Sequence, residues 1–377
     1  MTAPAWSGVR VVVDATAGAR RDCSGIGRYV HGIVRALAAR REAPPFELGV
    51  RLSKWRGRSF LPQGEGRPLR ARLVDDRLDW WLLRRVDLFH GLDVRITRSR
   101  RPVRVATLHD LFSFERNDLA DAPFRAMKQA HYKRLADEAD AIVCVSRATE
   151  ERFLSAFPRV RGRTTVVHHG IAERFRRADA AAIGSVRRTY RLLRPFLLFV
   201  GLLSTRKNLL VLLDAFAELA RRRDDVDLVL AGQESHGFAE IGDALARHPF
   251  AARVRKLGFV AEADLPALYS AAELFVLPSL SEGFGLPVLE AFACGTPVVA
   301  SNLPVLHEIG AGELLYADSK DPSALAATLA GALDRPPDAE RRARLAARAA
   351  PFTWSAAAER TLAVWQEALA RRPRGLG

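Results

Sequence analysis

The sequence predicts an α/β protein that contains two doubly wound parallel sheets. Short apolar runs alternate with longer amphipathic stretches along the whole chain of 377 residues, as is typical of strand–helix–strand units. This length suits two domains at about 150 residues each. The apolar pattern lapses in the Arg-rich segment 171–195, which indicates a hinge. We therefore expect one Rossmann-like domain over residues 1–175 and a second over residues 190–352.

The individual elements follow from the periodicity of apolar residues. Strands are predicted where short apolar runs are bounded by polar or turn residues: Val9–Val13, Phe46–Leu52, Leu88–Phe89, Arg104–Leu108, Ala141–Val145, Thr164–Val167, Phe196–Val200, Leu228–Ala231, Val254–Leu257, Leu274–Leu277 and Pro297–Ala300. Helices are predicted by apolar residues at three- and four-residue spacing: Arg28–Ala39, Arg125–Asp137, Leu209–Arg222, Ala263–Ser270, Pro287–Cys294, Pro322–Leu333 and Trp354–Ala370. The Gly- and Pro-containing segment Trp55–Gly66 is predicted to be a mobile loop or an insertion.

The net charge of +15 is concentrated in the first half of the chain. Residues 1–190 contain 37 basic and 21 acidic residues, whereas residues 191–377 contain 21 and 22. Such an asymmetry indicates an anionic partner, which could be nucleic acid, an acidic membrane surface or a phosphorylated substrate. A nucleic-acid-binding protein is the rival interpretation, but the sequence contains no zinc-finger, helix-turn-helix or aromatic RNA-binding signature.

The spacing of the cysteines and the first residues of the sequence indicate the cellular compartment. Cys23, Cys144 and Cys294 are far apart and have no paired spacing, which argues against a disulfide framework or a zinc site and favours a reducing cytosol. The apolar run Val9–Val13 is too short for a signal peptide, and no stretch approaches about 18 apolar residues. We expect a cytoplasmic protein that is soluble or peripherally attached to the inner face of the cell membrane.

The first motif with chemical meaning is SGIGRY at residues 24–29, which opens a helical pattern after a strand. Glycines at Gly25 and Gly27 would let the backbone approach a phosphate at a helix N-terminus, where unpaired N–H groups favour an anion. A plain tight turn is an equally good interpretation. The third glycine and the downstream acid of a dinucleotide-binding fingerprint are missing, which disfavours an NAD-dependent dehydrogenase.

The second motif is a pair of adjacent cations, Arg206 and Lys207, which lie between the strand Phe196–Val200 and the helix Leu209–Arg222. Ligands of doubly wound sheets bind at the carboxyl ends of strands. Two cations at this position could neutralise a diphosphate without a metal. The alternative is that they are solvated charges at a helix start.

The third motif, SEGFGLPVLE at residues 281–290, is the most informative. Glu282 follows the strand Leu274–Leu277 in a Gly-containing loop, Pro287 suits the first turn of a helix, and Glu290 falls on that helix. This arrangement would present loop N–H groups and one carboxylate to a sugar phosphate, while the second carboxylate reaches a ribose diol. Glu290 could otherwise be an ordinary acid on a helix surface.

His109 and an Asp-Val-Asp triplet are two further candidates for a functional site. His109 follows the strand Arg104–Leu108 and precedes Asp110, and its place at a strand end favours a role in a site over a purely structural one. Asp225-Val226-Asp227 matches the DxD pattern of some metal-dependent transferases. This triplet precedes a strand rather than ending one, so we interpret it as a solvated turn.

With these motifs in place, the chain resembles the retaining glycosyltransferases of family 4, which have the GT-B fold of two Rossmann-like domains facing each other across a cleft. The resemblance implies that a C-terminal helix, here within residues 353–377, returns to the first domain. The hallmark of that family is two glutamates separated by seven residues, here Glu282 and Glu290. The resemblance extends over nearly the whole chain, including the runs DATAGARRDCSGIGRYV, TLHDLFSFE, FVGLLSTRKNLLVLLDAF and LGFVAEADLPALYSAAELFVLPS. The GIGRY and HDL elements resemble the branch that builds bacterial polysaccharides and lipid-linked glycans, many members of which are mannosyltransferases.

The resemblance implies roles for individual residues. Catalytic roles are implied for His109, Glu282, Arg206 and Lys207. Donor-binding roles are implied for Gly25, Gly27, Arg206, Lys207, Lys256, Phe259, Glu282, Gly283, Phe284, Gly285, Leu286 and Glu290, with Lys256 and Phe259 bordering the base. Two departures from the family pattern stand out. Ser204-Thr205 replaces a common Glu-Pro, and His168-His169 replaces Pro-Asn and is expected to shape the turn into the linker.

The resemblance also implies the reaction. We expect a metal-independent, retaining hexosyltransferase that takes a hexose, with mannose favoured, from a nucleotide-diphosphate sugar and needs no cofactor. The donor half would be residues 190–352, and the basic N-terminal half would receive a glycan or a lipid-linked acceptor at an anionic membrane surface. Alternatives are a UDP-glucose- or dTDP-sugar-dependent enzyme with a small-molecule acceptor, and a relative that breaks or rearranges sugars, such as a phosphorylase or an epimerase.

Overall fold

The computed structural model describes residues 6, 8–19, 25–62, 69–116 and 118–371, and these residues form two compact units. Unit 1 comprises residues 1–114, 123–170 and 352–377, and unit 2 comprises residues 115–122 and 171–351. The chain therefore leaves unit 1 after Gly170 and returns to it at Phe352.

Unit 1 is formed around a seven-stranded parallel sheet with the order β3-β2-β1-β4-β5-β6-β7. Its strands are β1 (Val11–Asp14), β2 (Phe46–Arg51), β3 (Ala71–Val74), β4 (Leu88–Gly91), β5 (Val103–Leu108), β6 (Ala141–Cys144) and β7 (Thr164–Val166). Its helices are α1 (Gly25–Ala39), α2 (Asp79–Leu82), α3 (Phe112–Glu115), α4 (Ala122–Glu138), α5 (Arg147–Ala156) and α14 (Trp354–Arg371), with short 3-10 helices at η1 (Thr16–Gly18), η2 (Leu52–Phe60) and η3 (Pro158–Val160).

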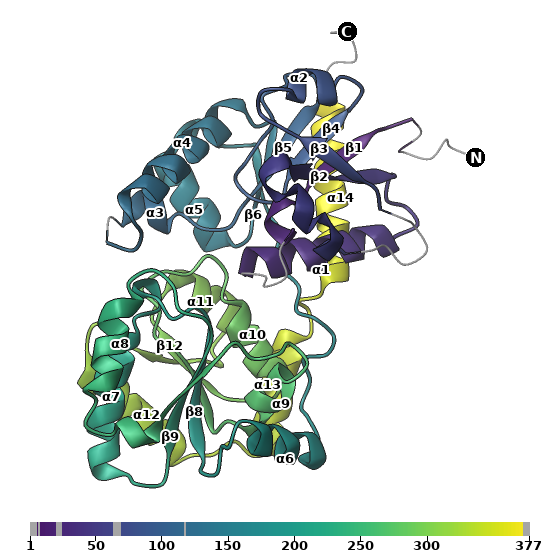
Figure 1. Ribbon diagram of the computed structural model, residues 1–377. Helices are drawn as coiled ribbons and strands as arrows, with labels where there is room; N and C mark the ends of the chain where they lie inside the picture. Colours follow the sequence, from purple (N-terminus) through teal and green to yellow (C-terminus); the bar gives the residue numbers. More distant parts are fainter. Residues whose placement is uncertain (1–5, 7, 20–24, 63–68, 117, 372–377) are drawn as a thin grey trace. The chain divides into compact units, whose positions relative to one another are not determined.

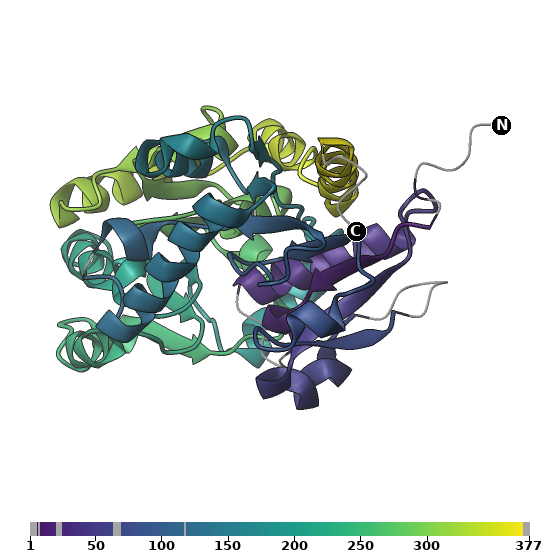
Figure 2. The same ribbon diagram turned by 90° about the horizontal axis from the view of Figure 1, so that it is seen from above.

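Alternating side chains of these strands bury both faces of the sheet. Val11 and Val13 join a cluster with α1 and α14, whereas Val12 packs on the opposite face with Phe89. The yellow helix α14 lies beside the purple helix α1 in both views (Figures 1 and 2). The fully buried Trp365 fixes α14 in this cluster, so the last helix completes the core of unit 1.

Unit 2 contains a six-stranded parallel sheet with the order β10-β9-β8-β11-β12-β13. Its strands are β8 (Phe196–Val200), β9 (Asp227–Ala231), β10 (Val254–Gly258), β11 (Leu274–Leu277), β12 (Val298–Ser301) and β13 (Leu315–Ala317). Its helices are α6 (Ala180–Thr189), α7 (Leu209–Arg222), α8 (Phe238–Ala246), α9 (Leu265–Ala271), α10 (Leu286–Ala293), α11 (Pro304–Gly310), α12 (Pro322–Leu333) and α13 (Ala339–Ala349), together with the 3-10 turns η4 (Thr205–Lys207) and η5 (Ala251–Arg253).

The predicted fold class, two doubly wound parallel sheets with a C-terminal helix in the first unit, is confirmed. Two strands that the sequence pattern missed, β3 and β13, are edge strands of their sheets. Both are short, and most of their residues are only partly buried, so they lack the apolar run on which the prediction relied. No helix in the described ranges is both long and apolar enough to cross a membrane.

Two predictions about irregular segments are corrected. Residues 52–60 form the 3-10 helix η2, so the first part of the expected loop Trp55–Gly66 is ordered, while residues 63–68 lie outside the described part. The expected hinge 171–195 contains α6, whose Asp179 caps the helix by accepting a hydrogen bond from the backbone N–H of Ala182.

Candidate functional site

The adjacency of β8 and β11 creates the candidate site in unit 2. These strands are parallel neighbours, so the segments that follow them emerge at the same edge of the sheet. The backbone N–H of Leu280, after β11, donates to the carbonyl of Arg206, after β8, at 2.9 Å. The side chain of Asn208 donates to the carbonyl of Pro278 at 3.1 Å. The two motifs that the sequence placed 75 residues apart are therefore joined.

The joined segments form a buried cluster of charges. Lys207 Nζ lies 2.5 Å from Glu282 Oε1, and Arg206 Nη1 lies 3.4 Å from Glu282 Oε2. Arg206 also donates to the carbonyl of Ser281 at 2.8 Å. Only 6% of Lys207 and 7% of Glu282 is exposed. Two cations therefore face one carboxylate at the strand edge.

The pKa of Glu282 follows from this arrangement. Burial raises the pKa, but the attraction of Lys207 and Arg206 lowers it more, and the net result is a pKa of about 2. Glu282 is therefore ionised at neutral pH. Its carboxylate contacts both cations.

The second glutamate is held by a different partner. Glu290 lies on α10 and is buried, and its Oε2 accepts a hydrogen bond from the Tyr269 hydroxyl at 3.0 Å. The helix α10 begins after Gly285, whose φ of +96° favours glycine, and Pro287 falls in its first turn. Gly283, Phe284, Gly285 and Leu286 form the buried approach to this helix. The two glutamates thus belong to one motif but are positioned by separate contacts.

The residues expected beside the base lie at the end of β10. Phe259 follows Gly258 and is 58% exposed. Lys256 Nζ lies 2.7 Å from Glu234 Oε1 and 4.9 Å from the centre of the Phe238 ring. Phe259 therefore offers an apolar ring to solvent, whereas Lys256 is held by Glu234 rather than by the Glu282 cluster.

In unit 1, His109 lies in a cluster of rings at the end of β5. The Tyr29 ring is 4.7 Å from His109 in an edge-on arrangement and 4.6 Å from His169 in a stacked one. His109 and His169 are 5.3 Å apart. The ring of His169, a residue predicted to shape the turn into the linker, is buried in this cluster and stacks against Trp354 at 6.0 Å.

The protonation of His109 can be read from its partner. Its Nε2 lies 2.9 Å from the carbonyl oxygen of Leu92, and a carbonyl can only accept, so Nε2 carries the hydrogen. Burial lowers the pKa of His109, against the opposing attraction of Asp93. The neutral ring therefore keeps a lone pair on Nδ1, which is suited to accept a hydrogen bond from a hydroxyl group.

A second buried histidine connects this cluster to the C-terminal helix. Trp365 Nε1 donates to His90 Nδ1 at 3.0 Å, so His90 Nε2 carries the hydrogen and donates to Thr107 Oγ1 at 3.0 Å. Thr107 Oγ1 lies 3.1 Å from the Tyr29 hydroxyl. Burial lowers the pKa of His90 to about 3. This chain of hydrogen bonds links α14 to the ring that packs against His109.

The remaining predicted residues are placed as follows. Gly25 opens α1 and Gly27 is buried in its first turn, while residues 20–24 lie outside the described part. A side chain at Gly25 would meet nothing within 4 Å among the described residues, so packing does not require glycine there. The Asp225 carboxylate accepts from Arg223 at 2.9 and 3.1 Å, and Asp227 opens β9.

Comparison with known proteins assigns the chain to a family. The sequence matches the model of glycosyl transferases group 1 over residues 191–350 and that of Glycosyltransferase Family 4 over residues 23–175. It is 30% identical to O-antigen chain mannosyltransferase B of Escherichia coli, over 93% of this chain and 98% of that protein. The chain belongs to the family 4 glycosyltransferases. This assignment leaves no support for the nucleic-acid-binding interpretation.

Solved structures show the same GT-B fold. Sucrose-phosphate synthase from Thermosynechococcus elongatus has a TM-score of 0.74 and 20% identity, over 97% of this chain and all of that one. Anabaena HepE, in complex with UDP and glucose, has a TM-score of 0.72 and 18% identity, over 95% of this chain and all of that one. Because the sequence identities are this low, the similarity to these solved structures shows the fold of the chain alone.

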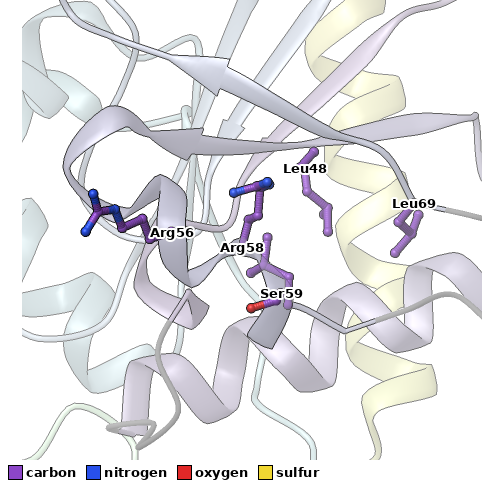
Figure 3. A pocket seen from close by; sticks show the side chains of 7 residues that line it. Leu48, Arg56, Arg58, Ser59 and Leu69 are labelled. Carbon is purple, nitrogen blue, oxygen red and sulfur yellow. The ribbon is translucent and has the colours of Figure 1, made fainter.

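A cavity of about 390 Å³ lies elsewhere in unit 1 and contains none of the predicted site residues. Arg56, Arg58 and Ser59 of η2 line it together with Leu48 and Leu69 (Figure 3). Arg56, Arg58 and Ser59 are exposed. Part of the segment Trp55–Gly66, which was expected to be a mobile loop or an acceptor-side insertion, lines this cavity, and the charge cluster of unit 2 does not.

Sequence reasoning missed several residues that position the site. One is Tyr269, which donates a hydrogen bond to Glu290. The others are Tyr29 and His169, whose rings pack against His109. These contacts join residues that lie 21 to 140 positions apart in the sequence. Tyr29 stands inside the quoted GIGRY run and His169 just before Gly170. Nothing in the local pattern of either run distinguishes a ring in a buried cluster from one on a surface.

The buried histidines predict that unit 1 becomes less stable in mild acid. Burial lowers the pKa values of His90, His109 and His169 in the folded chain, whereas unfolded imidazoles titrate near pH 6.5. Below that pH the unfolded chain binds more protons. The free energy of unfolding should therefore fall between pH 6.5 and 5.5, by about 1 kcal/mol for His90 alone. All six tryptophans belong to unit 1, so tryptophan emission in urea measures this unit.

A matched pair of variants checks the assignment. His90→Gln should reduce this pH dependence by about 1 kcal/mol, whereas His236→Gln, which removes an exposed histidine of unit 2, should leave it unchanged. Equal unfolding midpoints of the wild-type protein at pH 7.5 and 5.5 would contradict the neutral state of the cluster.

Proposed function

We propose that the protein transfers a hexose, with mannose favoured, from a nucleotide-diphosphate sugar to a hydroxyl of a glycan or lipid-linked acceptor in cell-envelope polysaccharide synthesis. The observation that carries this proposal is the buried cluster of Arg206, Lys207 and Glu282 at the carboxyl edge of the unit 2 sheet. The mannosyltransferase from Escherichia coli, which aligns with nearly the whole chain, supports the sugar class.

In this proposal, unit 2 binds the donor. The diphosphate lies against Arg206, Lys207 and the N–H groups of residues 283–286, where α10 begins. Glu282 exchanges its cations for hydroxyls of the transferred sugar, and Glu290, held by Tyr269, binds the ribose hydroxyls. The exposed ring of Phe259 borders the base together with Lys256.

Unit 1 provides the remaining groups and receives the acceptor. Gly25 and Gly27 place the start of α1 at the diphosphate, and the lone pair on His109 Nδ1 accepts a hydrogen bond from a sugar hydroxyl. We propose that the reaction proceeds with retention by a same-face substitution, in which the departing phosphate oxygen takes the proton of the acceptor. The developing charge on the leaving diphosphate is stabilised by Arg206 and Lys207 without a metal.

The reaction takes place, in this proposal, at the cytoplasmic face of the cell membrane. A lipid-linked acceptor is confined to a bilayer, and a basic surface is attracted to an anionic leaflet. The positive charge of residues 1–190 lies mainly in the segments that form unit 1, and it supports this location.

Removal of either cation should mainly lower kcat. Arg206→Ala and Lys207→Met each take away charge stabilisation of the leaving group, and kcat should fall about 100-fold or more. Steady-state transfer assays measure the effect. Arg247→Ala is the control, because Arg247 is an exposed cation of unit 2 that follows α8, and its kcat should be unchanged. An unaltered kcat for Arg206→Ala would remove this residue from the site.

The donor should stabilise the protein against heat, and only one class of base should do so. A ligand present at 100 times its Kd adds about 2.7 kcal/mol to the stability of the folded state. Thermal unfolding with GDP-, UDP- and dTDP-hexoses in the presence of EDTA measures the shift. A shift with one base class supports the proposal and identifies the donor. No shift with any of them, or a shift that EDTA abolishes, contradicts donor binding without a metal.

A further inference from the structure

Two adjacent tryptophans on the surface of unit 1 have no role in the site described above. Trp80 is 69% exposed and Trp81 is 49% exposed. The other four tryptophans of the chain are buried or partly buried. Large aromatic side chains contribute most when they are removed from water, and a pair that stays in contact with water indicates an interaction surface. Leu78, 49% exposed, adds a third apolar side chain to the same short segment.

This segment is firmly attached to unit 1. It includes α2, labelled at the outer edge of unit 1 in Figure 1. The fully buried carboxylate of Asp79 accepts a hydrogen bond from the backbone N–H of Asp75 at 2.8 Å and from the hydroxyl of Thr97 at 2.7 Å. Leu83 and Val86 are buried on the sheet beside Phe89. The apolar side chains are therefore presented outward from a fixed base.

The same segment exposes only positive charge. Arg77, Arg84 and Arg85 are all exposed, and the one acid between residues 77 and 85 is the buried Asp79. The guanidinium of Arg84 lies 4.6 Å from the centre of the Trp81 ring, and its Nη1 donates to the Trp81 carbonyl at 3.1 Å. We call the six exposed residues Arg77, Leu78, Trp80, Trp81, Arg84 and Arg85 the tryptophan–arginine face.

We propose that the tryptophan–arginine face inserts into the interface of an anionic lipid bilayer. Tryptophan prefers the headgroup level of a membrane because its ring is apolar and its N–H is polar. Arginine side chains extend along apolar surface and place their charge at lipid phosphates. A neutral glycan would not require three cations beside the rings. The combination of apolar rings and the three exposed arginines is complementary to an acidic leaflet.

This inference deepens the membrane part of the proposed function and is independent of its transferase part. It assigns the contact to one face instead of to the diffuse charge of residues 1–190. The cation-rich helix η2, with Arg56 and Arg58, is a comparable basic surface of unit 1. It therefore provides a charge-matched comparison.

The test is co-sedimentation of the full chain with vesicles of phosphatidylcholine alone or with about one third phosphatidylglycerol, together with tryptophan emission. The wild-type protein should bind the anionic vesicles, shift its emission to the blue, and release in high salt. Trp80→Ser/Trp81→Ser and Arg77→Gln/Arg84→Gln should each weaken binding at least about tenfold. Arg56→Gln/Arg58→Gln, and Leu193→Ser as an exposed apolar residue of unit 2, should bind nearly as wild type.

Three results would overturn the inference: no binding of the wild-type protein to anionic vesicles, equal binding of the tryptophan variant, or a loss confined to the η2 variant. Self-association without lipid that disappears in the tryptophan variant would also overturn it, because the face would then bind a second copy. The thermal shift with donor is measured on every variant. Its persistence in variants that do not bind vesicles separates the membrane contact from donor binding.

Discussion

The buried contact between Lys207 and Glu282 is the interaction on which the proposed donor site depends. Parallel pairing of β8 and β11 brings the two residues to one edge of the sheet. Neither charge could remain buried alone, since breaking such a pair costs about 3–5 kcal/mol by leaving one charge uncompensated. The pair therefore fixes the turn after β8 against the loop that leads into α10. The position of Glu290 follows, because it lies on that helix and is held there by Tyr269.

In the proposed function, the same cluster exchanges its internal carboxylate, Glu282, for the phosphates of the donor. Two cations contact the one carboxylate, and Arg206 is the more exposed of the two cations. An incoming diphosphate would compete with Glu282 for these cations and would release the carboxylate toward the sugar. In unit 1 the corresponding group, His109, is kept neutral by burial and oriented by Leu92 and Tyr29. The cluster of unit 2 is thus charged, whereas the ring cluster of unit 1 is neutral.

Much of this could be predicted from the sequence, and the failures have physical reasons. The central strands are buried on both faces, so their apolar runs predicted the fold. The edge strands β3 and β13 are only partly buried, and they were not predicted. Arg206, Lys207, Glu282 and Glu290 were found because strand-end motifs are local. Tyr269, Tyr29 and His169 were missed because their roles depend on contacts with distant segments.

The structure also shows how much of the net positive charge lies on the surface. Several arginines of the basic half act inside the fold: Arg95 is buried against Asp14, and Arg163 donates to the carbonyls of Ala139 and Ala136. The overall count therefore overstates the charge available to a partner. What distinguishes the surface of unit 1 is the local combination of exposed tryptophans and arginines around α2, which no total can reveal.

The central claim, that Glu282 and a nucleotide diphosphate share the same two cations, is tested most directly by calorimetric titration with the nucleoside diphosphate that stabilises the wild-type protein. Glu282→Gln removes the internal competitor but keeps the shape of the side chain, so the Kd should decrease by about fivefold or more, whereas Lys207→Met should increase it. Weaker binding by Glu282→Gln, or unchanged binding by Lys207→Met, would contradict the account.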